Sequence, residues 1–434
     1  MAGSRLEIVE VDEAGNTTAT YITNEGSAGK KPDPSSRVDV ILPQDPKSLW
    51  QKGLDVFLPA GYPQSVTEDY MAYQIYDSLQ AFSSSIAGLL SGRAVLQGVG
   101  VGDASATPTA ALLYTVLQES AGRLATILFA YRLGTALEPE CKMYRLAADI
   151  FNDAAMILDC LSPVFPKPIR IAILSSSSIL RALCGVAAGS SKASLSAHFA
   201  KWGNLGELNA KDSSQETVIS LIGMLAGSMV VSSISSPLAT WSTLLFLLGV
   251  HISMNHAAVR SVSMRSLNRQ RANIVFSHLL AYDKMLTPQQ VSRRERIFER
   301  SGVLRWADDH MVGHGKIGVS LGDLIRSLGG SGATLTELLD LYADEAYILW
   351  FDPHSSTAHI VLKQGCTPEQ QLKAWCQGLL LAKKTSEAGS STEGAETLRE
   401  ITRVFSEYSR RLRVAGWDLN SAALETRSGT RVKV

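Results

Sequence analysis

Apolar and polar residues alternate in three ways along this chain, and each way predicts a different kind of element. Residues 5–23 alternate singly on both sides of a Glu-Ala-Gly-Asn turn, which predicts a small β-hairpin. Between about residue 65 and residue 257, apolar positions recur with helical spacing in long segments, which predicts about six helices. The remainder mixes alternating and amphipathic segments, which is typical of a smaller α/β domain.

These changes in pattern divide the chain into four regions. The turn-rich residues 24–36 follow the hairpin, so we expect residues 1–44 to be an N-terminal hairpin and a flexible linker. Residues 45–259 are the apolar helical domain, and residues 260–384 are the C-terminal α/β domain. Residues 385–434 combine a linker with a terminal amphipathic helix. The fold class that we predict is mainly α, with a membrane-type helical domain.

The most apolar part of the helical domain carries no formal charge. No Asp, Glu, Lys or Arg occurs between Glu216 and Arg260, and Pro237 divides this stretch in two. Each half has the length of helix that crosses a bilayer, so we predict a membrane hairpin, with a buried hairpin in a soluble protein as the alternative. Gly223 and Gly227 have the GxxxG spacing that lets two helices approach closely in lipid.

Helix starts in this region suggest an internal repeat. Ser65 with Glu68, and Ser213 with Glu216, have the spacing of capping boxes, which predicts that a helix begins after each. DASATPTAALLYTVLQ and DSSQETVISLIGMLAG both place polar residues before an apolar helix. They predict two three-helix units, 65–160 and 168–257, in opposite orientations, as in many transporters. Shared helix-start chemistry explains the similarity equally well.

Charge is balanced over the whole chain but not along it. The 41 Lys and Arg residues equal the 41 Asp and Glu residues, so no global field attracts nucleic acid. From Arg260 to Arg300, however, there are nine Lys or Arg residues and three Asp or Glu residues. By the positive-inside rule, this flank and the domain after it lie on the cytosolic side of a multi-pass protein. The first residues, MAGSRLEIVEVDEAG, show neither a signal-peptide nor a transit-peptide pattern.

No group of residues points to catalysis. In GVGVGDASATP, at residues 98–108, Asp103 stands where a dinucleotide fingerprint needs its third glycine, and an acid there repels phosphate. His310 and His314 are four apart, but the glycines beside them predict a loop, which disfavours metal ligation. The five cysteines are odd in number and scattered, which is typical of buried thiols rather than disulfides. We therefore expect no enzyme activity, no metal and no cofactor.

Ionisable groups within or beside the apolar helices are the remaining candidates. In lipid such groups must face the protein interior and are functional candidates by default, whereas in a soluble bundle they are surface charges. Arg145, Asp149 and Asp153 share one helix face, and the simplest interpretation pairs the two carboxylates with Arg145. The candidate polar site consists of Asp103, Ser105, Arg123, Asp149, Asp153, Glu207 and Asp212.

Four long motifs resemble the root UVB sensitive family, whose domain is also called the vitamin B6 photoprotection and homoeostasis domain. They are FLPAGYPQSVTEDYMAYQIYDSLQAF, GVGVGDASATPTAALL, RLAADIFNDAAMILDCLSP and NAKDSSQETVISLIG, within about residues 45–280. The resemblance implies a eukaryotic membrane-associated protein; plant members are linked to UV-B-sensitive root growth, vitamin B6 homeostasis and auxin transport. It supplies no catalytic residue and no substrate.

These expectations lead to three hypotheses about function. The first is a membrane carrier, or an accessory protein, in small-molecule homeostasis, with an unknown ligand and acidic residues at a central site. The second is a non-transporting membrane adaptor whose C-terminal domain recruits protein partners. The third is a soluble protein that binds pyridoxal phosphate. In the first two, the partners are the lipid bilayer and another protein, either a paralogue or a second copy, and not nucleic acid.

Overall fold

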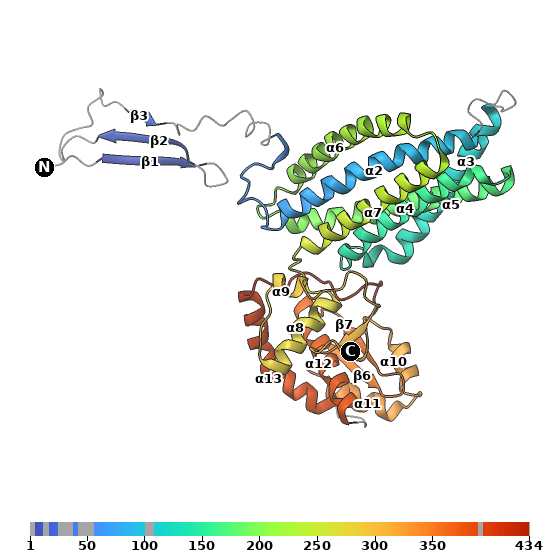
Figure 1. Cartoon of the computed structure of the whole chain (residues 1–434). Helices are drawn as coiled ribbons and strands as arrows, with labels where there is room; N and C mark the ends of the chain where they lie inside the picture. The colour runs from blue at the N-terminus through green and yellow to red at the C-terminus, as the bar shows by residue number, and fades with distance from the viewer. Residues whose placement is uncertain are drawn as a thin grey trace. The chain divides into compact units, whose positions relative to one another are not determined.

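The computed structural model describes residues 5–11, 17–24, 38–41, 56–99, 108–388 and 394–433. The chain divides into two compact units (Figure 1). The first consists of Met1–Met71 and Ser196–Ile222, and the second consists of Ala72–Leu195 and Gly223–Val434.

The first unit contains an antiparallel sheet with the strand order β1-β2-β3. The strands are β1 (Arg5–Val11), β2 (Thr17–Asn24) and β3 (Val38–Ile41). Ile8 pairs with Tyr21 in the register of β1 and β2, so the predicted hairpin is confirmed, and β3 extends it by one strand. The turn of the hairpin lies outside the described residues, and so does the linker that we predict at 24–36, except for Asn24, which ends β2.

Six long helices follow along the chain. They are α2 (Tyr70–Val99), α3 (Pro108–Leu133), α4 (Cys141–Leu161), α5 (Lys167–Phe199), α6 (Leu205–Ser233) and α7 (Pro237–Ser261). Within the described residues, α5, α6 and α7 are long and apolar enough to cross a membrane, judged by length and composition alone. The count of membrane-crossing helices and the internal repeat remain predictions.

Neither predicted capping box begins a helix. The second prediction is wrong because α6 already begins at Leu205: the residues before Ser213 include good helix formers, and Thr217 Oγ1 donates to the Ser213 carbonyl inside the helix. The first is wrong because α2 begins at Tyr70, and the buried Ser65 hydroxyl makes no hydrogen bond within the described part of the chain.

The two GxxxG glycines bring α6 against α2, as their spacing predicts. A Cβ on Gly223 would lie 2.7 Å from Ser85 Cβ, and one on Gly227 would lie 3.2 Å from Ile86 Cα. The contact therefore advances in the same direction on both helices, so α2 and α6 run parallel. Only the missing glycine side chains allow the two backbones to come this close.

Arg93 of α2 continues this contact at the end of α6. Its guanidinium donates to the carbonyl oxygens of Val231 and Ile234, at 2.9 and 2.8 Å, and to Thr240 Oγ1 on α7 at 3.0 Å. The last carbonyls of a helix lack partners within the helix, and a cation there is favourable. One side chain thus stabilises the end of α6 and ties it to α7.

The C-terminal region is a mixed α/β domain, as the sequence predicts. Its elements are α8 (Arg269–Tyr282), α9 (Pro288–Ser292), β4 (Val303–Arg305), β5 (Met311–Ile317), α10 (Leu321–Ser327), α11 (Gly332–Leu341), β6 (Tyr347–Asp352), β7 (Thr357–Lys363), α12 (Pro368–Ala388), α13 (Gly394–Val414) and β8 (Arg431–Val432). The sheet has the order β4-β5-β7-β6, with β8 also paired to β7. The fully buried Trp375 of α12 lies in the core between this sheet and the helices.

Two details of this domain differ from prediction. The glycines beside His314 predict a loop, but His314 lies in strand β5. The next residue, Gly315, leaves room for the Trp375 ring, because a Cβ on Gly315 would lie 2.8 Å from that ring. Residues 385–388 belong to α12, and α13 begins at Gly394, so both ends of the predicted linker are helical. All five cysteines are free.

Replacing Gly223 by Ala should destabilise the protein, whereas the matched change Gly249→Ala should not. A Cβ at residue 223 would also lie 3.0 Å from the Phe82 carbonyl oxygen, so α2 and α6 must separate, at a cost of about 1–3 kcal/mol. Gly249 on α7 has open space around it and gains helix propensity. Thermal unfolding compares the two variants. A melting temperature for G223A equal to that of the native protein would contradict the close contact.

Candidate functional site

A row of buried ionisable side chains follows one side of α4. Each is at most 7% exposed, and their partners come from α2, α5, α7, the C-terminal region and α4 itself. The row consists of Lys142, Arg145, Asp149, Asp153 and Asp159. Charged residues are almost never fully buried unless they are paired, so these partners decide whether the arrangement is stable.

Arg145 is at the centre of the row and joins α4 to α2. Its guanidinium donates to Asp77 at 2.6 Å and to Asp149 at 3.0 Å, and its Nε donates to the Tyr73 hydroxyl at 3.3 Å. All four side chains are at least nine-tenths buried. The interpretation that pairs Arg145 with both carboxylates is therefore confirmed for Asp149 but wrong for Asp153, which contacts His251 instead, and Asp77 is a partner that the sequence did not indicate.

His251 and Asn255 of α7 complete this group of residues. His251 Nδ1 lies 2.7 Å from Asp153 Oδ1, and its Nε2 lies 3.3 Å from Asp149 Oδ2. Asn255 Nδ2 donates to Asp149 and to the Arg145 carbonyl. The central cluster, as we name it, consists of Tyr73, Asp77, Arg145, Asp149, Asp153, His251 and Asn255.

The central cluster contains more carboxylates than permanent cations. It holds three carboxylates and one guanidinium: Asp77 and Asp149 pair with Arg145, whereas Asp153 contacts His251, which adds a positive charge only when it is protonated. In addition, Asp153 Oδ2 is buried and has no hydrogen-bond partner within the described residues. An acceptor in this state favours the binding of a proton, a cation or a hydrogen-bond donor.

A second ion pair lies further along α4. Asp159 accepts hydrogen bonds from Ser91 of α2 at 2.9 Å and from Ser177 of α5 at 2.6 Å, and it pairs with Arg181 of α5. Both Asp159 oxygens are therefore satisfied, whereas Asp153 Oδ2 has no partner within the described residues. We interpret this pair as structural, because it leaves no acceptor without a partner.

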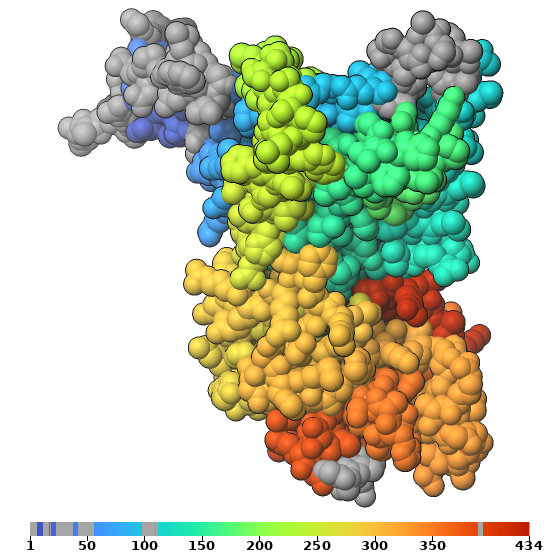
Figure 2. All heavy atoms as spheres, turned by 45° about the vertical axis from the view of Figure 1, so that its right-hand side comes forward, coloured from blue at the N-terminus to red at the C-terminus, as the bar shows by residue number. Residues whose placement is uncertain are grey.

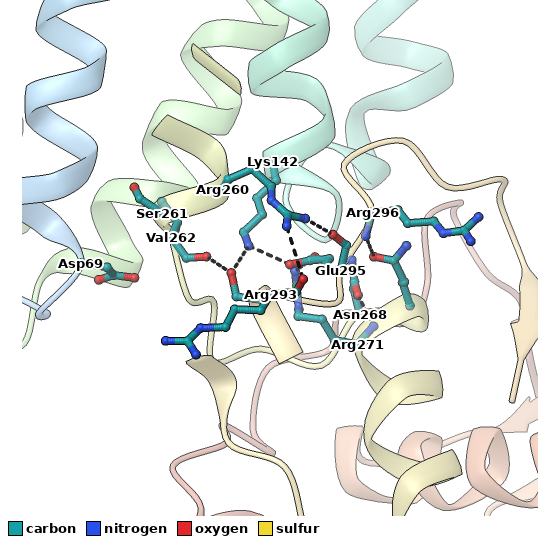
Figure 3. A network of polar contacts seen from close by, with 12 residues as sticks. Asp69, Lys142, Arg260, Ser261, Val262, Asn268, Arg271, Arg293, Glu295 and Arg296 are labelled. Carbon is teal, nitrogen blue, oxygen red and sulfur yellow. Dashed lines mark hydrogen bonds and ion pairs between the residues drawn. The ribbon is translucent and has the colours of Figure 1, made fainter. Parts of the chain in front are cut away.

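The junction cluster joins the first turn of α4 to the C-terminal region (Figure 3). It consists of Lys142, Arg271 and Glu295. Glu295 accepts from Lys142 Nζ at 2.7 Å and from Arg271 Nη1 at 2.7 Å, and Lys142 also donates to Ser292. Burial alone would raise the pKa of the Glu295 carboxyl, but the charges and hydrogen bonds of Lys142 and Arg271 lower that pKa below its usual value.

Comparison with known proteins identifies the family. The model of the vitamin B6 photo-protection and homoeostasis domain matches residues 43–283, and that of the root UVB sensitive protein C-terminal domain matches residues 284–428. The chain belongs to the root UVB sensitive family. In this root UVB sensitive protein, the central cluster lies within the first matched domain, and the junction cluster joins the first to the second.

Relatives in the family come from plants and from an amoeba. Protein root UVB sensitive 3 of Arabidopsis thaliana is 32% identical over 378 residues, which are 85% of this chain and 83% of that protein. RUS family member 1 of Dictyostelium discoideum is 40% identical over 247 residues, which are 56% of this chain and 47% of that protein. Root UVB sensitive 2, chloroplastic, of Arabidopsis thaliana is 24% identical over 375 residues. No solved structure matches this chain.

The structure brings together two of the candidate site residues, Asp149 and Asp153. Arg123 lies on the exposed face of α3, where it pairs with Glu119 at 3.5 Å. Glu207 and Asp212 lie on α6 within the first unit. The Glu207 carboxylate accepts from the Ala60 amide at 2.7 Å, and Asp212 is buried. The other two candidates, Asp103 and Ser105, lie outside the described residues.

Sequence patterns missed four of the seven residues in the central cluster of this root UVB sensitive protein: Tyr73, Asp77, His251 and Asn255. His251 is one of two histidines in the long uncharged stretch, with His256, and Asn255 follows His251 at i, i+4 on the same helix face. That spacing is the signal that could have found them. Within the described residues, no group of three or more His, Cys, Asp or Glu side chains is arranged to hold a metal ion, and His310 and His314 belong to no such group.

Glu295→Gln should destabilise the protein, because it leaves two buried cations without their carboxylate. Within the described chain, Glu295 is the ion-pair partner of both Lys142 and Arg271, and breaking a buried pair costs about 3–5 kcal/mol. The matched control is Glu407→Gln, which breaks an exposed, solvent-screened pair with Arg410 and should change stability far less. Chemical denaturation measures both variants; equal losses would refute the role assigned to Glu295.

The lowered pKa of Glu295 also predicts how stability depends on pH. The folded carboxyl binds a proton less readily than the unfolded one, so acid favours the unfolded state. The stabilisation is complete above the unfolded pKa, about 4.5, and is lost as the pH falls through the lower folded pKa. Unfolding free energies measured between pH 7 and pH 3 should therefore fall less steeply in E295Q than in the native protein. Parallel curves would contradict this assignment.

Proposed function

We propose that this protein is an integral membrane carrier, or an accessory to one, in small-molecule homeostasis related to vitamin B6. The observation that carries the proposal is the distribution of polarity in the helices: ionisable groups are buried, and large apolar side chains are exposed. A water-soluble bundle has the opposite distribution, and soluble monomers rarely expose extended apolar patches. The family membership supports the link to vitamin B6.

The exposed apolar side chains lie on helices α3, α6 and α7. On α3 they include Leu112, Leu113, Val116, Leu117, Leu124, Ile127, Leu128 and Tyr131. On α6 and α7 they include Leu221, Ile222, Met224, Leu225, Met229, Leu238, Leu245 and Phe246. Lipid acyl chains are the surroundings in which such a surface is stable. We place the C-terminal domain on the cytosolic side, because the Arg-rich residues 260–300 follow α7.

The central cluster is the site at which this carrier would act. Its excess of carboxylates suits a proton, or the cationic group of a substrate, and the Asp153 oxygen without a partner is the acceptor to which that group would bind. His251 links Asp153 to Asp149, so one proton can be shared along the cluster. This role requires no covalent chemistry, which agrees with the expectation of no enzyme activity.

The variants Asp149→Asn and Asp153→Asn test the carrier. Each removes a buried negative charge while keeping the shape of the side chain, so uptake of labelled pyridoxine into proteoliposomes, or rescue of cells lacking the protein, should fall by at least about tenfold at normal protein levels. The control Glu119→Gln removes a charge from the exposed face of α3 and should keep full activity. Unchanged function in both Asp variants would reject the central cluster as the site.

The alternative is a membrane adaptor that does not transport. It is favoured by the C-terminal region, which has its own core around Trp375 and its own family model. An adaptor predicts that the two Asp variants retain function, while substitutions on the exposed surface of the C-terminal domain abolish it and release a protein partner. Extraction at alkaline pH tests the membrane location itself: release of the protein into the supernatant would favour the soluble pyridoxal phosphate-binding hypothesis.

A further inference from the structure

An arginine-rich cavity lies where the helices meet the C-terminal region. Its volume is about 290 Å³, which is near the lower limit for small-ligand pockets. It is lined by the end of α3, the beginning of α4, the beginning of α8, residues 296–303 and residues 426–427. Its arginines are Arg132, Arg269, Arg296, Arg300 and Arg427.

Carboxylates do not balance these arginines. Two carboxylates line the cavity, and both are already engaged: Glu140 with Arg269 at 3.4 Å, and Glu299 with Arg305 at 2.6 Å. Arg296 pairs with Asp309 and, in Figure 3, extends away from the junction cluster. The cavity therefore carries an excess of positive charge.

Three of the five guanidinium groups are available to a ligand. Arg132, Arg300 and Arg427 are exposed, and none of them has an ion-pair partner within the described residues. The guanidinium group presents paired N–H donors whose geometry matches the oxygens of a phosphate. Several such groups around one small cavity favour a phosphate group over a carboxylate or a neutral ligand.

The surface beside the cavity is apolar. Arg132 belongs to the last turn of α3, and it follows directly on Leu124, Ile127, Leu128 and Tyr131, which are 62–82% exposed. Figure 2 shows the C-terminal segment, in red, against the lower end of the cyan and green helices, in agreement with the hydrogen bond from Thr135 to Thr426. The arginine-rich cavity and the apolar face of α3 are therefore neighbours.

We propose that this cavity binds the phosphate headgroup of an anionic phospholipid, whose acyl chains lie along the exposed face of α3. In the proposed membrane location, acyl chains lie along the apolar face of α3 beside the cavity, so a phospholipid reaches the arginines with its headgroup and α3 with its chains, whereas a free phosphate compound would use the arginines alone. Arg269, Arg296 and Arg300 also belong to the Arg-rich flank 260–300 that we place on the cytosolic side, where anionic lipids are enriched. The inference rests on the proposed membrane location, but it does not depend on transport.

Native mass spectrometry of the full chain in phosphatidylcholine nanodiscs with increasing phosphatidylglycerol tests this site. The native protein should retain phosphatidylglycerol in preference to phosphatidylcholine. Each change of Arg132, Arg300 or Arg427 to Gln should weaken retention about fivefold, and the triple variant about a hundredfold. The control triple variant, Arg399→Gln, Arg403→Gln and Arg410→Gln on α13, removes the same charge outside the cavity and should bind like the native protein.

The outcomes separate this inference from the proposed function. Incorporation into nanodiscs without a preference for phosphatidylglycerol, or an equal preference in the triple variant, overturns the lipid site but leaves the membrane location intact. Millimolar inorganic phosphate or pyridoxal phosphate is also added as a competitor. If either displaces phosphatidylglycerol to the same extent as added phosphatidylglycerol does, the lipid site is overturned in favour of a free phosphate ligand. Failure to enter nanodiscs of either composition overturns the membrane location and the lipid site together.

Discussion

The burial of charge along α4 is the constraint on which the rest of the second unit depends. Removing an ion from water costs several kcal/mol, and only a close partner with further hydrogen bonds offsets that cost. Asp77 must therefore face Arg145, His251 must face Asp153, and Glu295 must face Lys142. These three requirements decide which helices surround α4 and where the C-terminal region is attached. Apolar packing fills the space between these pairs, as it does around Leu90 and Leu244.

Local patterns predicted elements well, and long-range contacts poorly. The β1–β2 hairpin and the start of α7 at Pro237 follow from alternation and turn residues, which act over a few positions. The strand that contains His314 depends instead on the approach of Trp375, and a single sequence does not contain that information. The candidate site shows the same division: Arg145, Asp149 and Asp153 share a face of one helix, whereas Asp77, His251 and Asn255 come from helices far away in the sequence.

The two family domains are less separate than their sequence boundary suggests. The boundary between residues 283 and 284 falls just after α8, yet the α8 residues Ala272 and Phe276 belong to the hydrophobic core of the second domain. Lys142 and Arg145, one helical turn apart, belong to the junction cluster and the central cluster respectively. A rotation of α4 would therefore disturb both clusters at once, so that the C-terminal domain and the central cluster are physically linked.

The parallel contact between α2 and α6 has a consequence for how the protein is made. Arg93 and the carbonyl of Val231 that it holds are 138 residues apart, so α2 is synthesised long before its partner exists. At roughly 5–20 residues per second, the ribosome needs on the order of ten seconds to reach α6. During that interval the α2 surface around Ser85, shaped for a helix with glycines, has no native partner. The nascent chain must shield it from other helices until Gly223 and Gly227 have been added.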